Sequence, residues 1–435
     1  MGAVYLDHNA TTPLADEVRE AMLPFLEGKH GNPSTHHAMG REAREAIEQA
    51  RATCATFFGC AADEVVFTSG GTEGNNLALK GAAWGLPEDR RQILIGAAEH
   101  PSVSETVRFL TRFGFEVEEI PTDEFGKVHP AALAKALRPN TGLVSIMHAQ
   151  NVVGTVNPVE ELAEVLRGRP VLFHVDAAQS VGKIPASFLF SGADFMTVAA
   201  HKFYGPKGAG CLLVKRGRQL ESLFHGAGHE RGLRAGTENT AGIVGLAAAI
   251  ELARDTQAEA GERIVALRDL LHARLAQGLP GVVLNGHPHD RLPNTLNLSF
   301  MGVTGAAIAA RVPELMLATG PACHDRAAAL PGVFRAMGID AARGSATLRL
   351  TLGRSNTRDE IEQAAEQLIA AVRALRAEAG ALPPEAEAPS QLPTCPRAGC
   401  GKPLDFQAGL HGPEVGCERG ACPYLCLAPP PGVQV

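Results

Sequence analysis

A lysine in a Gly/Pro-rich turn is the most informative candidate for chemistry in this sequence. Lys202 follows an apolar run that predicts a buried strand, and Gly205, Pro206 and Gly208 come shortly after it. Open α/β proteins bind their ligands at the carboxyl ends of parallel strands. A lysine desolvated there has a lowered pKa, so its neutral amine can react with a carbonyl. An isolated turn lysine is usually a surface residue, so the neighbouring motifs decide the interpretation.

An aspartate at the end of another apolar run is the second candidate. Asp176 lies within 171–177, and burying its charge is costly unless it meets a cation or hydrogen-bond donors. The protonated pyridine nitrogen of pyridoxal phosphate (PLP) is such a cation, and the pair makes the ring an electron sink. Gln179 comes one turn later, where it would reach the phenolic oxygen of the ring. The simpler alternative is that Asp176 caps the N-terminus of the following helix. The presence of Lys202 favours the cofactor interpretation over this alternative.

Two further segments complete a predicted cofactor site. Gly71 and Thr72 lie in the strand–turn–helix junction 68–76, where backbone N–H groups and the helix dipole suit a phosphate. The junction lacks the lysine and the spacing of a nucleotide P-loop. His100 follows the next predicted strand, where an imidazole could stack on the PLP ring and move protons. A lone histidine in that position would more often be structural.

The elements that must position these residues form an α/β pattern. Continuous apolar runs predict seven strands, mostly buried on both faces, with helices between them. The ranges are 64–69, 92–98, 116–121, 142–149, 171–177, 194–199 and 210–215. After residue 250, a helix over 251–278 and more strongly alternating strands predict a smaller α+β domain. We assign 16–250 to a large domain, 1–15 and 251–378 to the small domain, and the Pro/Ala/Glu-rich 379–394 to a linker.

Composition sets limits on the function. The 435 residues are 45% hydrophobic and carry 47 acidic and 40 basic side chains, for a formal charge of −7. That length predicts at least two domains, and the charge gives no reason to expect direct nucleic-acid binding. No apolar run approaches a membrane span, and the N-terminus does not have the pattern of a signal peptide. We therefore expect a cytoplasmic protein that does not bind membranes.

The ordered motifs resemble those of cysteine desulfurases, which have the class V aminotransferase fold. The similarity runs from Tyr-Leu-Asp-His-Asn-Ala-Thr-Thr-Pro at 5–13 to about residue 375. It includes the segments 31–34, 69–73, 99–101, 173–180, 201–206, 234–239 and 350–354. The resemblance implies a PLP-dependent transferase fold of the aspartate aminotransferase type, with a mixed, mostly parallel seven-stranded sheet. It also implies a homodimer.

The resemblance also implies a role for each matching residue. Lys202 would bind PLP as a Schiff base, Asp176 and Gln179 would contact the ring nitrogen and phenolic oxygen, and His100 would stack on the ring. The phosphate site would be formed by Gly71, Thr72, His201 and, from the other subunit, Thr237. Asn151, beside the cofactor, and Arg349 would hold the substrate carboxylate, Arg349 as a bidentate clamp.

Cys323 matches the catalytic cysteine loop of the resembled family. Its thiolate would attack the sulfur of PLP-bound cysteine, which gives alanine and a Cys323 persulfide. Three positions depart from the common pattern. Ala199 replaces a serine that bonds the cofactor phosphate, His324 replaces Thr or Ser, and Val152 replaces Glu. The first two changes resemble selenocysteine lyases of the same fold.

Five cysteines crowd into residues 395–435, which we assign to a Cys-rich, metal-binding tail. Cys395, Cys400, Cys417 and Cys422 form two close pairs separated by a loop, and Cys426 is a spare. Two such pairs suit tetrahedral Zn²⁺ in a module too short to have much core of its own. An iron–sulfur cluster and a set of sulfur-relaying thiols are the alternatives.

The sequence is consistent with three candidate functions. The first is a cysteine desulfurase that delivers sulfur from L-cysteine to an acceptor protein, such as a scaffold or a thiolation enzyme. The second is a selenocysteine lyase that releases selenium and alanine. The third is a non-catalytic scaffold for sulfur-transfer partners, which the presence of Lys202, Asp176, His100 and Cys323 argues against.

Overall fold

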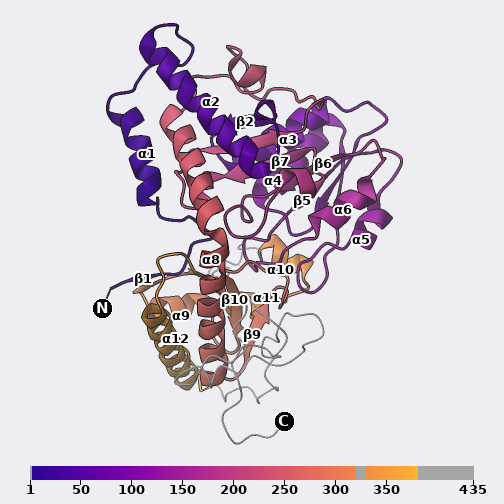
Figure 1. Ribbon diagram of the computed structural model, residues 1–435. Helices are drawn as coiled ribbons and strands as arrows, with labels where there is room; N and C mark the ends of the chain where they lie inside the picture. Colours follow the sequence, from indigo (N-terminus) through magenta and orange to yellow (C-terminus); the bar gives the residue numbers. More distant parts are fainter. Residues whose placement is uncertain (1, 320–329, 381–435) are drawn as a thin grey trace, which may run out of the picture. The chain divides into compact units, whose positions relative to one another are not determined.

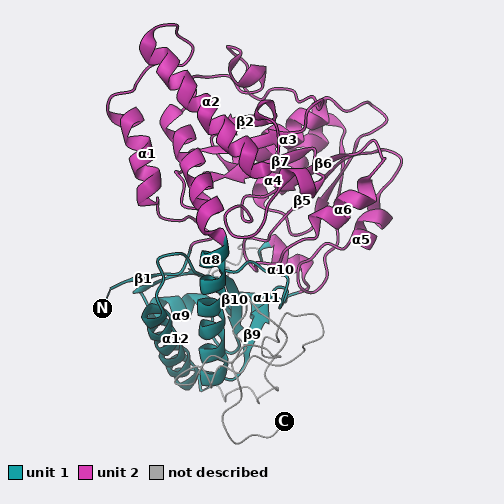
Figure 2. Ribbon diagram, in the orientation of Figure 1, with its two compact units in different colours: residues 1–7, 258–331, 339–435 teal, residues 8–257, 332–338 magenta. Residues whose placement is uncertain are grey.

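The computed structural model describes residues 2–319 and 330–380, which divide into two compact units (Figure 2). The larger unit comprises residues 8–257 and 332–338. The described residues of the smaller unit are 2–7, 258–319, 330–331 and 339–380. Each unit has its own hydrophobic core.

A seven-stranded sheet forms the centre of the larger unit (Figure 1), which confirms the predicted sheet. Its first neighbours, β2 and β8, are antiparallel, as are β8 and β7, and the remaining pairs are parallel. In spatial order the strands are β2 (Val65–Thr68), β8 (Gly210–Val214), β7 (Phe195–Ala199), β6 (Leu172–Asp176), β5 (Thr141–Met147), β3 (Gln92–Gly96) and β4 (Glu116–Ile120).

Helices cover both faces of this sheet. Successive strand residues point to opposite sides, so each buried strand contributes side chains to the core on each face. Leu94 of β3 packs in a core with α2, α6 and α8, whereas its neighbours Ile93 and Ile95 pack with α3 and α4. The helices of this unit are α1 (Asp16–Glu27), α2 (Ala38–Phe58), α3 (Gly71–Trp84), α4 (Pro101–Leu110), α5 (Pro130–Ala136), α6 (Val159–Leu166), α7 (Phe188–Ser191), α10 (Gly332–Ala336) and the first part of α8 (Thr240–Gly278).

The sheet directions bring several loops to one edge. Because β2 and β7 are both antiparallel to β8, they run parallel to each other and to β6, β5 and β3. The segments after these strands therefore leave the sheet at the same edge. They begin at residues 69, 200, 177, 148 and 97, and they contain most of the predicted site residues.

The smaller unit is an α+β structure around an antiparallel sheet of order β12-β13-β10-β9. The strands are β12 (Ala318–Thr319), β13 (Thr347–Thr351), β10 (Thr295–Phe300) and β9 (Val282–Asn285). Leu271, Leu298, Leu348 and Leu368 are all fully buried in its core. The other elements are a parallel pair, β1 (Val4–Tyr5) and β11 (Leu315–Met316), the second part of α8, and the helices α9 (Gly305–Arg311), α11 (Ala341–Ser345) and α12 (Arg358–Glu378).

Two boundaries differ from those expected. Residues 8–15 belong to the larger unit instead of the small domain, because Thr12 N–H donates to the His201 carbonyl at 2.9 Å and Ala15 N–H to that of Tyr204 at 3.1 Å. Helix α8 begins at Thr240, eleven residues before the expected start at 251. Beyond Gly380, the predicted linker and the Cys-rich module lie outside the described residues.

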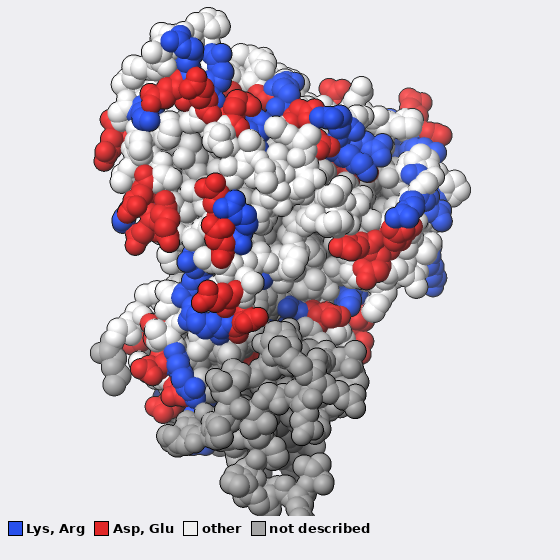
Figure 3. All heavy atoms as spheres, in the orientation of Figure 1, with Lys and Arg blue, Asp and Glu red and all other residues white. Residues whose placement is uncertain are grey.

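The described surface mixes charges of both signs. Figure 3 shows Lys and Arg side chains interspersed with Asp and Glu on the visible face. None of the helices in residues 2–319 and 330–380 combines the length and the apolar character needed to cross a membrane.

Candidate active site

Lys202 ends the short 3₁₀ turn Ala200–Lys202 that follows β7. Its Nζ donates to the carbonyl oxygens of Asn9 at 2.7 Å and Ala10 at 2.8 Å. Since β7 is entirely buried, the strand fixes the start of the lysine turn at the sheet edge. The lysine amine is therefore anchored at the place where the topology collects the other candidate residues.

The segment 8–12 straps across the lysine turn. The Thr12 hydroxyl donates to the His201 carbonyl at 3.1 Å and accepts from Tyr204 N–H at 2.6 Å. Tyr204 has φ 68°, a left-handed conformation that is strained for a non-glycine residue. Thr12 thus stabilises a strained turn two residues beyond Lys202.

Asp176 is a buried carboxylate at the end of β6, with 5% of its surface exposed. Its Oδ1 accepts from Ala178 N–H at 3.0 Å, and its Oδ2 accepts from Asn75 Nδ2 at 2.8 Å. It forms no ion pair within residues 2–319 and 330–380. A buried carboxylate is unfavourable without a cation. This residue therefore fits the protonated pyridine nitrogen of PLP.

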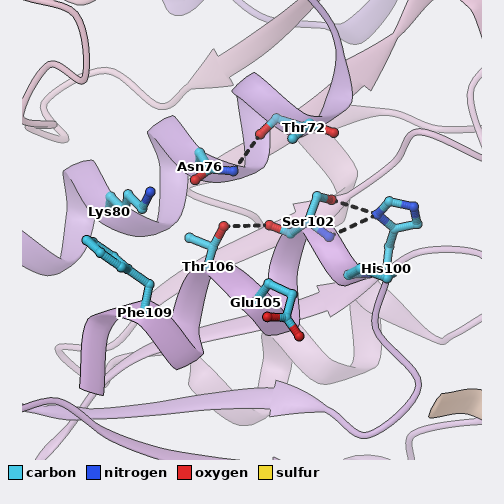
Figure 4. Close-up of a pocket in the computed structure, with 9 residues that line it drawn as sticks. Thr72, Asn76, Lys80, His100, Ser102, Glu105, Thr106 and Phe109 are labelled. Carbon is cyan, nitrogen blue, oxygen red and sulfur yellow. Dashed lines mark hydrogen bonds between the residues drawn. The ribbon is translucent and has the colours of Figure 1, made fainter. Parts of the chain in front are cut away.

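Asn75 and Ser102 link Asp176 to His100. Asn75 Nδ2 also donates to Ser102 Oγ at 2.8 Å, and Ser102 Oγ lies 2.8 Å from His100 Nδ1 (Figure 4). Since His100 Nδ1 also accepts from Ser102 N–H at 3.1 Å, both contacts are satisfied when the ring proton is on Nε2. Burial lowers the pKa of His100; Asp176 acts against this and Lys202 adds to it. His100 is thus a neutral imidazole electrostatically coupled to both residues.

The N-terminus of α3 carries Gly71 and Thr72, the residues predicted to bind a phosphate. Gly70 has φ 138° and no side chain caps the helix, so the first-turn N–H groups have no acceptor within α3. A Cβ on Gly71 would lie 3.5 Å from Ala199 Cβ, which places the helix start against the end of β7. Such a junction suits a phosphate. Ala199 supplies no hydroxyl there.

His201 lies in the lysine turn and contacts the segment 8–12. Its Nδ1 lies 3.1 Å from Thr11 Oγ1. Burial, together with the charges of Lys202, Lys207 and Lys183, lowers the pKa of His201 to about 4. The ring is therefore neutral near pH 7, and the positive charge in this region comes from lysines.

A groove of about 460 Å³ extends from the candidate site between α3 and α4 (Figure 4). Thr72 and His100 line one end, and Lys80 and Phe109 line the other, where Lys80 Nζ lies 4.6 Å from the Phe109 ring centre. The phosphate and ring-stacking candidates thus share a cavity.

Gln179 and Asn151 each form a hydrogen bond with Asn9. Gln179 Nε2 donates to the Asn9 carbonyl at 2.9 Å, and Asn9 Nδ2 donates to the Asn151 carbonyl at 3.2 Å. Asn151 Oδ1 accepts from Gln150 Nε2 at 3.2 Å. The strap therefore connects Lys202 to two more predicted site residues.

The other predicted residues lie elsewhere. Arg349 is on β13 of the smaller unit, where its Nη2 lies 2.6 Å from Asp7 Oδ1. Thr237 is exposed between the 3₁₀ turn His229–Gly232 and α8. Cys323 falls outside the described residues, as do the predicted zinc ligands Cys395, Cys400, Cys417 and Cys422. Within residues 2–319 and 330–380, no three His, Cys, Asp or Glu side chains are grouped to hold a metal ion.

Sequence reasoning missed Asn9, Asn75, Ser102 and Lys183. Asn75 follows Gly71 and Thr72 by one helical turn, and Ser102 follows His100 by two residues, so their motifs offered a signal. Asn9 lies in the N-terminal motif that had been grouped with the small domain. Lys183 is one turn beyond Gln179, a spacing that favours contact within a helical turn.

Comparisons with known proteins identify the family of this chain. The model of the aminotransferase class-V family matches residues 4–364. "Cysteine desulfurase IscS" of Dictyoglomus turgidum is 42% identical over 375 residues, covering 86% of this chain and 95% of that protein. A protein of the same name from Methanosarcina thermophila is 38% identical over 379 residues, covering 86% of this chain and 93% of that protein.

Solved structures give the same similarity. A "NifS-like protein" superposes with a TM-score of 0.81 at 36% identity, covering 85% of this chain and 99% of that chain. A structure named "SspA in complex with cysteine" has a TM-score of 0.71 and 32% identity, covering 81% of this chain and 100% of that chain.

Proposed function

The chain belongs to the aminotransferase class-V family, and on that premise we propose that it is a cysteine desulfurase. It converts L-cysteine to L-alanine and transfers the sulfur to Cys323. The structural observation that carries the proposal is the Asp176 carboxylate, which is buried, held by two donors and free of ion pairs within the described residues. That environment suits the ring nitrogen of PLP and no ordinary surface role.

The chain offers a group for each part of the cofactor. When bound, PLP supplies a conjugated electron sink for charge that develops on the substrate. Lys202 would hold it covalently through Nζ, Asp176 would hold its ring nitrogen, and Gln179 its phenolic oxygen. The phosphate would be bound by the first-turn N–H groups of α3 at Gly71 and Thr72, by His201 and, in a homodimer, by Thr237 of the second subunit.

Four side chains would handle the substrate. Arg349 and Asn151 hold the carboxylate of L-cysteine, with the planar guanidinium making two parallel hydrogen bonds. Lys202 Nζ removes and returns the proton at the α-carbon. His100 is neutral, and because Ser102 occupies its Nδ1, it exchanges protons through Nε2.

The sulfur transfer balances without an added oxidant. The Cys323 thiolate attacks the substrate sulfur, so an S–S bond forms while the substrate C–S bond breaks. The electron pair of the broken bond stays with the β-carbon, which takes up a proton and becomes the methyl group of alanine. Cys323 is left as a persulfide that passes its outer sulfur to an acceptor.

Incubation of the PLP-loaded protein with L-cysteine tests this function. We expect alanine and enzyme-bound persulfide in equal amounts in a first turnover, and sulfide when a thiol reductant is present. Cys323→Ala should retain bound PLP and form no persulfide. If the wild-type protein makes no alanine, or if Cys323→Ala desulfurates cysteine at the normal rate, the proposal is wrong.

Selenocysteine lyase is the second candidate function. It is favoured by Ala199, which is 2% exposed beside the phosphate junction, and by His324 in the cysteine loop. Val152 also departs from the desulfurase pattern. Comparing alanine release from L-cysteine and from L-selenocysteine separates the two activities. Activity with selenocysteine alone, unaffected by Cys323→Ala, would establish the lyase.

The cellular setting is a further part of the proposal. We propose a cytoplasmic homodimer that passes sulfur to an acceptor protein, such as a scaffold for iron–sulfur assembly or a thiolation enzyme. The unpaired thiols of Cys54, Cys60 and Cys211 support a reducing compartment. Sedimentation of the wild-type protein measures the oligomeric state, and mixing PLP-loaded Thr237→Ala and Lys202→Ala proteins tests whether a site is shared between subunits.

The C-terminal cysteines carry a separate proposal. We propose that Cys395, Cys400, Cys417 and Cys422 bind one structural Zn²⁺, because their paired spacing suits tetrahedral thiolate ligation. Metal analysis of the full chain should find one zinc per chain. Cys395→Ser should lose it while desulfurase activity with L-cysteine and free thiol remains; iron and labile sulfide in place of zinc would indicate a cluster.

A further inference from the structure

Lys183 is not one of the predicted cofactor residues, but it contacts one of them, Gln179. It lies half-buried one turn beyond Gln179, after β6. Its Nζ donates to Gln179 Oε1 at 2.5 Å and to Asn9 Oδ1 at 3.0 Å. The same ammonium group thus bridges the turn that carries Gln179 and the strap that carries Asn9.

This contact determines which way the Gln179 amide faces. A lysine ammonium has three donors and no acceptor, so the atom beside it must be the amide oxygen. The Gln179 NH₂ group is then turned to the other side, where it donates to the Asn9 carbonyl at 2.9 Å. Lys202 Nζ donates to that same carbonyl at 2.7 Å. The orientation set by Lys183 therefore presents the amide donor next to the lysine amine.

The positive charge on this side of the candidate site comes from lysine side chains. Burial and the Lys183 charge lower the pKa of His8 to about 4, so both His8 and His201 are neutral near pH 7. Lys183, Lys202 and Lys207 therefore supply the positive charge on this side of the site. Asp176, the carboxylate at the end of β6, accepts hydrogen bonds from Asn75 Nδ2 and Ala178 N–H.

We propose that Lys183 is a positioning residue that orients the Gln179 amide so that its NH₂ group, and not its oxygen, faces the cofactor beside Lys202. The inference rests on the proposed PLP-dependent function. With Lys183 in place, an anionic phenolic oxygen meets an amide donor. Without it, only the Asn9 carbonyl holds the amide in this orientation, and a 180° rotation would turn the amide oxygen toward the anionic phenolic oxygen.

Titration of the visible absorbance band of the PLP-loaded protein tests the proposal. The band reports protonation of the linkage that Lys202 forms with the cofactor. The charged or titratable groups placed around it are Lys183, Lys207, His8, His100, His201 and Asp176. Losing a cation and an oriented donor stabilises the protonated, cationic form of the linkage. Lys183→Met should therefore move the midpoint upward by about one pH unit and weaken PLP binding by about tenfold.

Two variants separate orientation from charge. Lys183→Arg keeps a cationic donor and should titrate within about 0.3 pH units of wild type, a small part of one ordinary charge effect. Lys207→Met removes a cation of the same cluster from an exposed position with no recorded contact to Gln179, so it should shift the midpoint less than half as far.

The outcomes are distinct. A Lys183→Met midpoint equal to that of wild type, or an equal shift in Lys207→Met, overturns the inference. If Lys183→Met does not fold, a wild-type midpoint and PLP affinity in Lys183→Ala, which also removes the donor, overturn it instead. Failure of wild-type protein to develop the band at all would overturn the proposed PLP function and not this orientation.

Discussion

Asn75 Nδ2 lies 2.8 Å from Asp176 Oδ2, so an amide from the first turns of α3 supports the carboxylate at the end of β6. Both residues are buried, with 1% and 5% of their surface exposed. The same NH₂ group holds Ser102 Oγ, and through it His100. One asparagine thus ties the group proposed for the ring nitrogen to the histidine proposed to stack on the ring.

Asn75→Asp should severely weaken PLP binding. Two carboxyl groups 2.8 Å apart cannot both be ionised, so the variant raises the pKa of the pair and neutralises the partner that the ring nitrogen needs. We expect the PLP dissociation constant, measured by equilibrium dialysis, to rise at least about tenfold. Gln277→Glu adds the same charge at an exposed position of the smaller unit, outside the groove of Figure 4, and serves as the control. Equal PLP affinity in Asn75→Asp and wild type would contradict the role given to Asp176.

The larger unit should lose stability in mild acid through His174. This ring is fully buried between Ser145 Oγ at 2.8 Å and Thr197 Oγ1 at 3.0 Å. Burial lowers its pKa to about 4, although Asp176 acts in the opposite direction. As pH falls below about 6.5, the unfolded chain takes up a proton that the folded chain excludes, and this continues until about pH 4. The loss is about 1.4 kcal/mol per pH unit in that window.

Thermal melting between pH 7 and pH 4 measures this effect. His174→Gln removes the titrating group while retaining polar atoms, so its melting temperature should fall less steeply with acid than that of wild type. His30→Gln, at an exposed position, is the control. The prediction fails if all three proteins show the same acid slope.

The large sheet could be predicted because buried parallel strands leave a direct pattern. In each of β3, β7 and β8 all five residues are buried, and all of them are apolar except Gln92 in β3 and Thr197 in β7. The start of α8 could not be placed, because its first eleven residues are mainly Ala, Gly and Ile without a clear polar face. A helix with small apolar residues on every side has no period to detect.

The residues of the candidate site also differ in whether the sequence predicts them. His100, Asp176 and Lys202 were predictable because each follows an apolar strand, and topology brings such positions together. Asn9 was not, because its contacts with Gln179 and Lys183 span 170 and 174 residues. Hydrogen bonds between such distant segments leave no local pattern in a sequence. The orientation of an amide such as Gln179 is likewise visible only from its neighbours.

Cys60 should resist alkylation in the folded protein. Burial raises its pKa to about 12, and the charges of Glu64, Cys54 and Asp63 act in the same direction. At pH 8 its thiolate fraction is about 10³-fold below that of an ordinary cysteine, and the thiolate is the reactive form. Peptide mapping after brief iodoacetamide treatment should therefore show Cys60 unlabelled. Labelling in urea is the control, and rapid modification of Cys60 in native protein would show that its environment is not the buried one described.

Arg349→Lys should impair substrate binding without affecting PLP. Arg349 is 14% exposed and is held by Asp7, whose Oδ1 lies 2.6 Å from Nη2. A lysine keeps the charge but cannot bind a carboxylate through two parallel hydrogen bonds. We expect KM for L-cysteine to rise roughly 10- to 100-fold, equivalent to about 1.4–2.8 kcal/mol, while the PLP absorbance stays at its wild-type value. Asp7→Asn should give a smaller increase in KM, because it removes the ion pair that orients the guanidinium and leaves the guanidinium itself in place. Arg358→Lys, on a surface pair with Glu362, is the matched control. An unchanged KM in Arg349→Lys would show that the substrate carboxylate is bound by other groups.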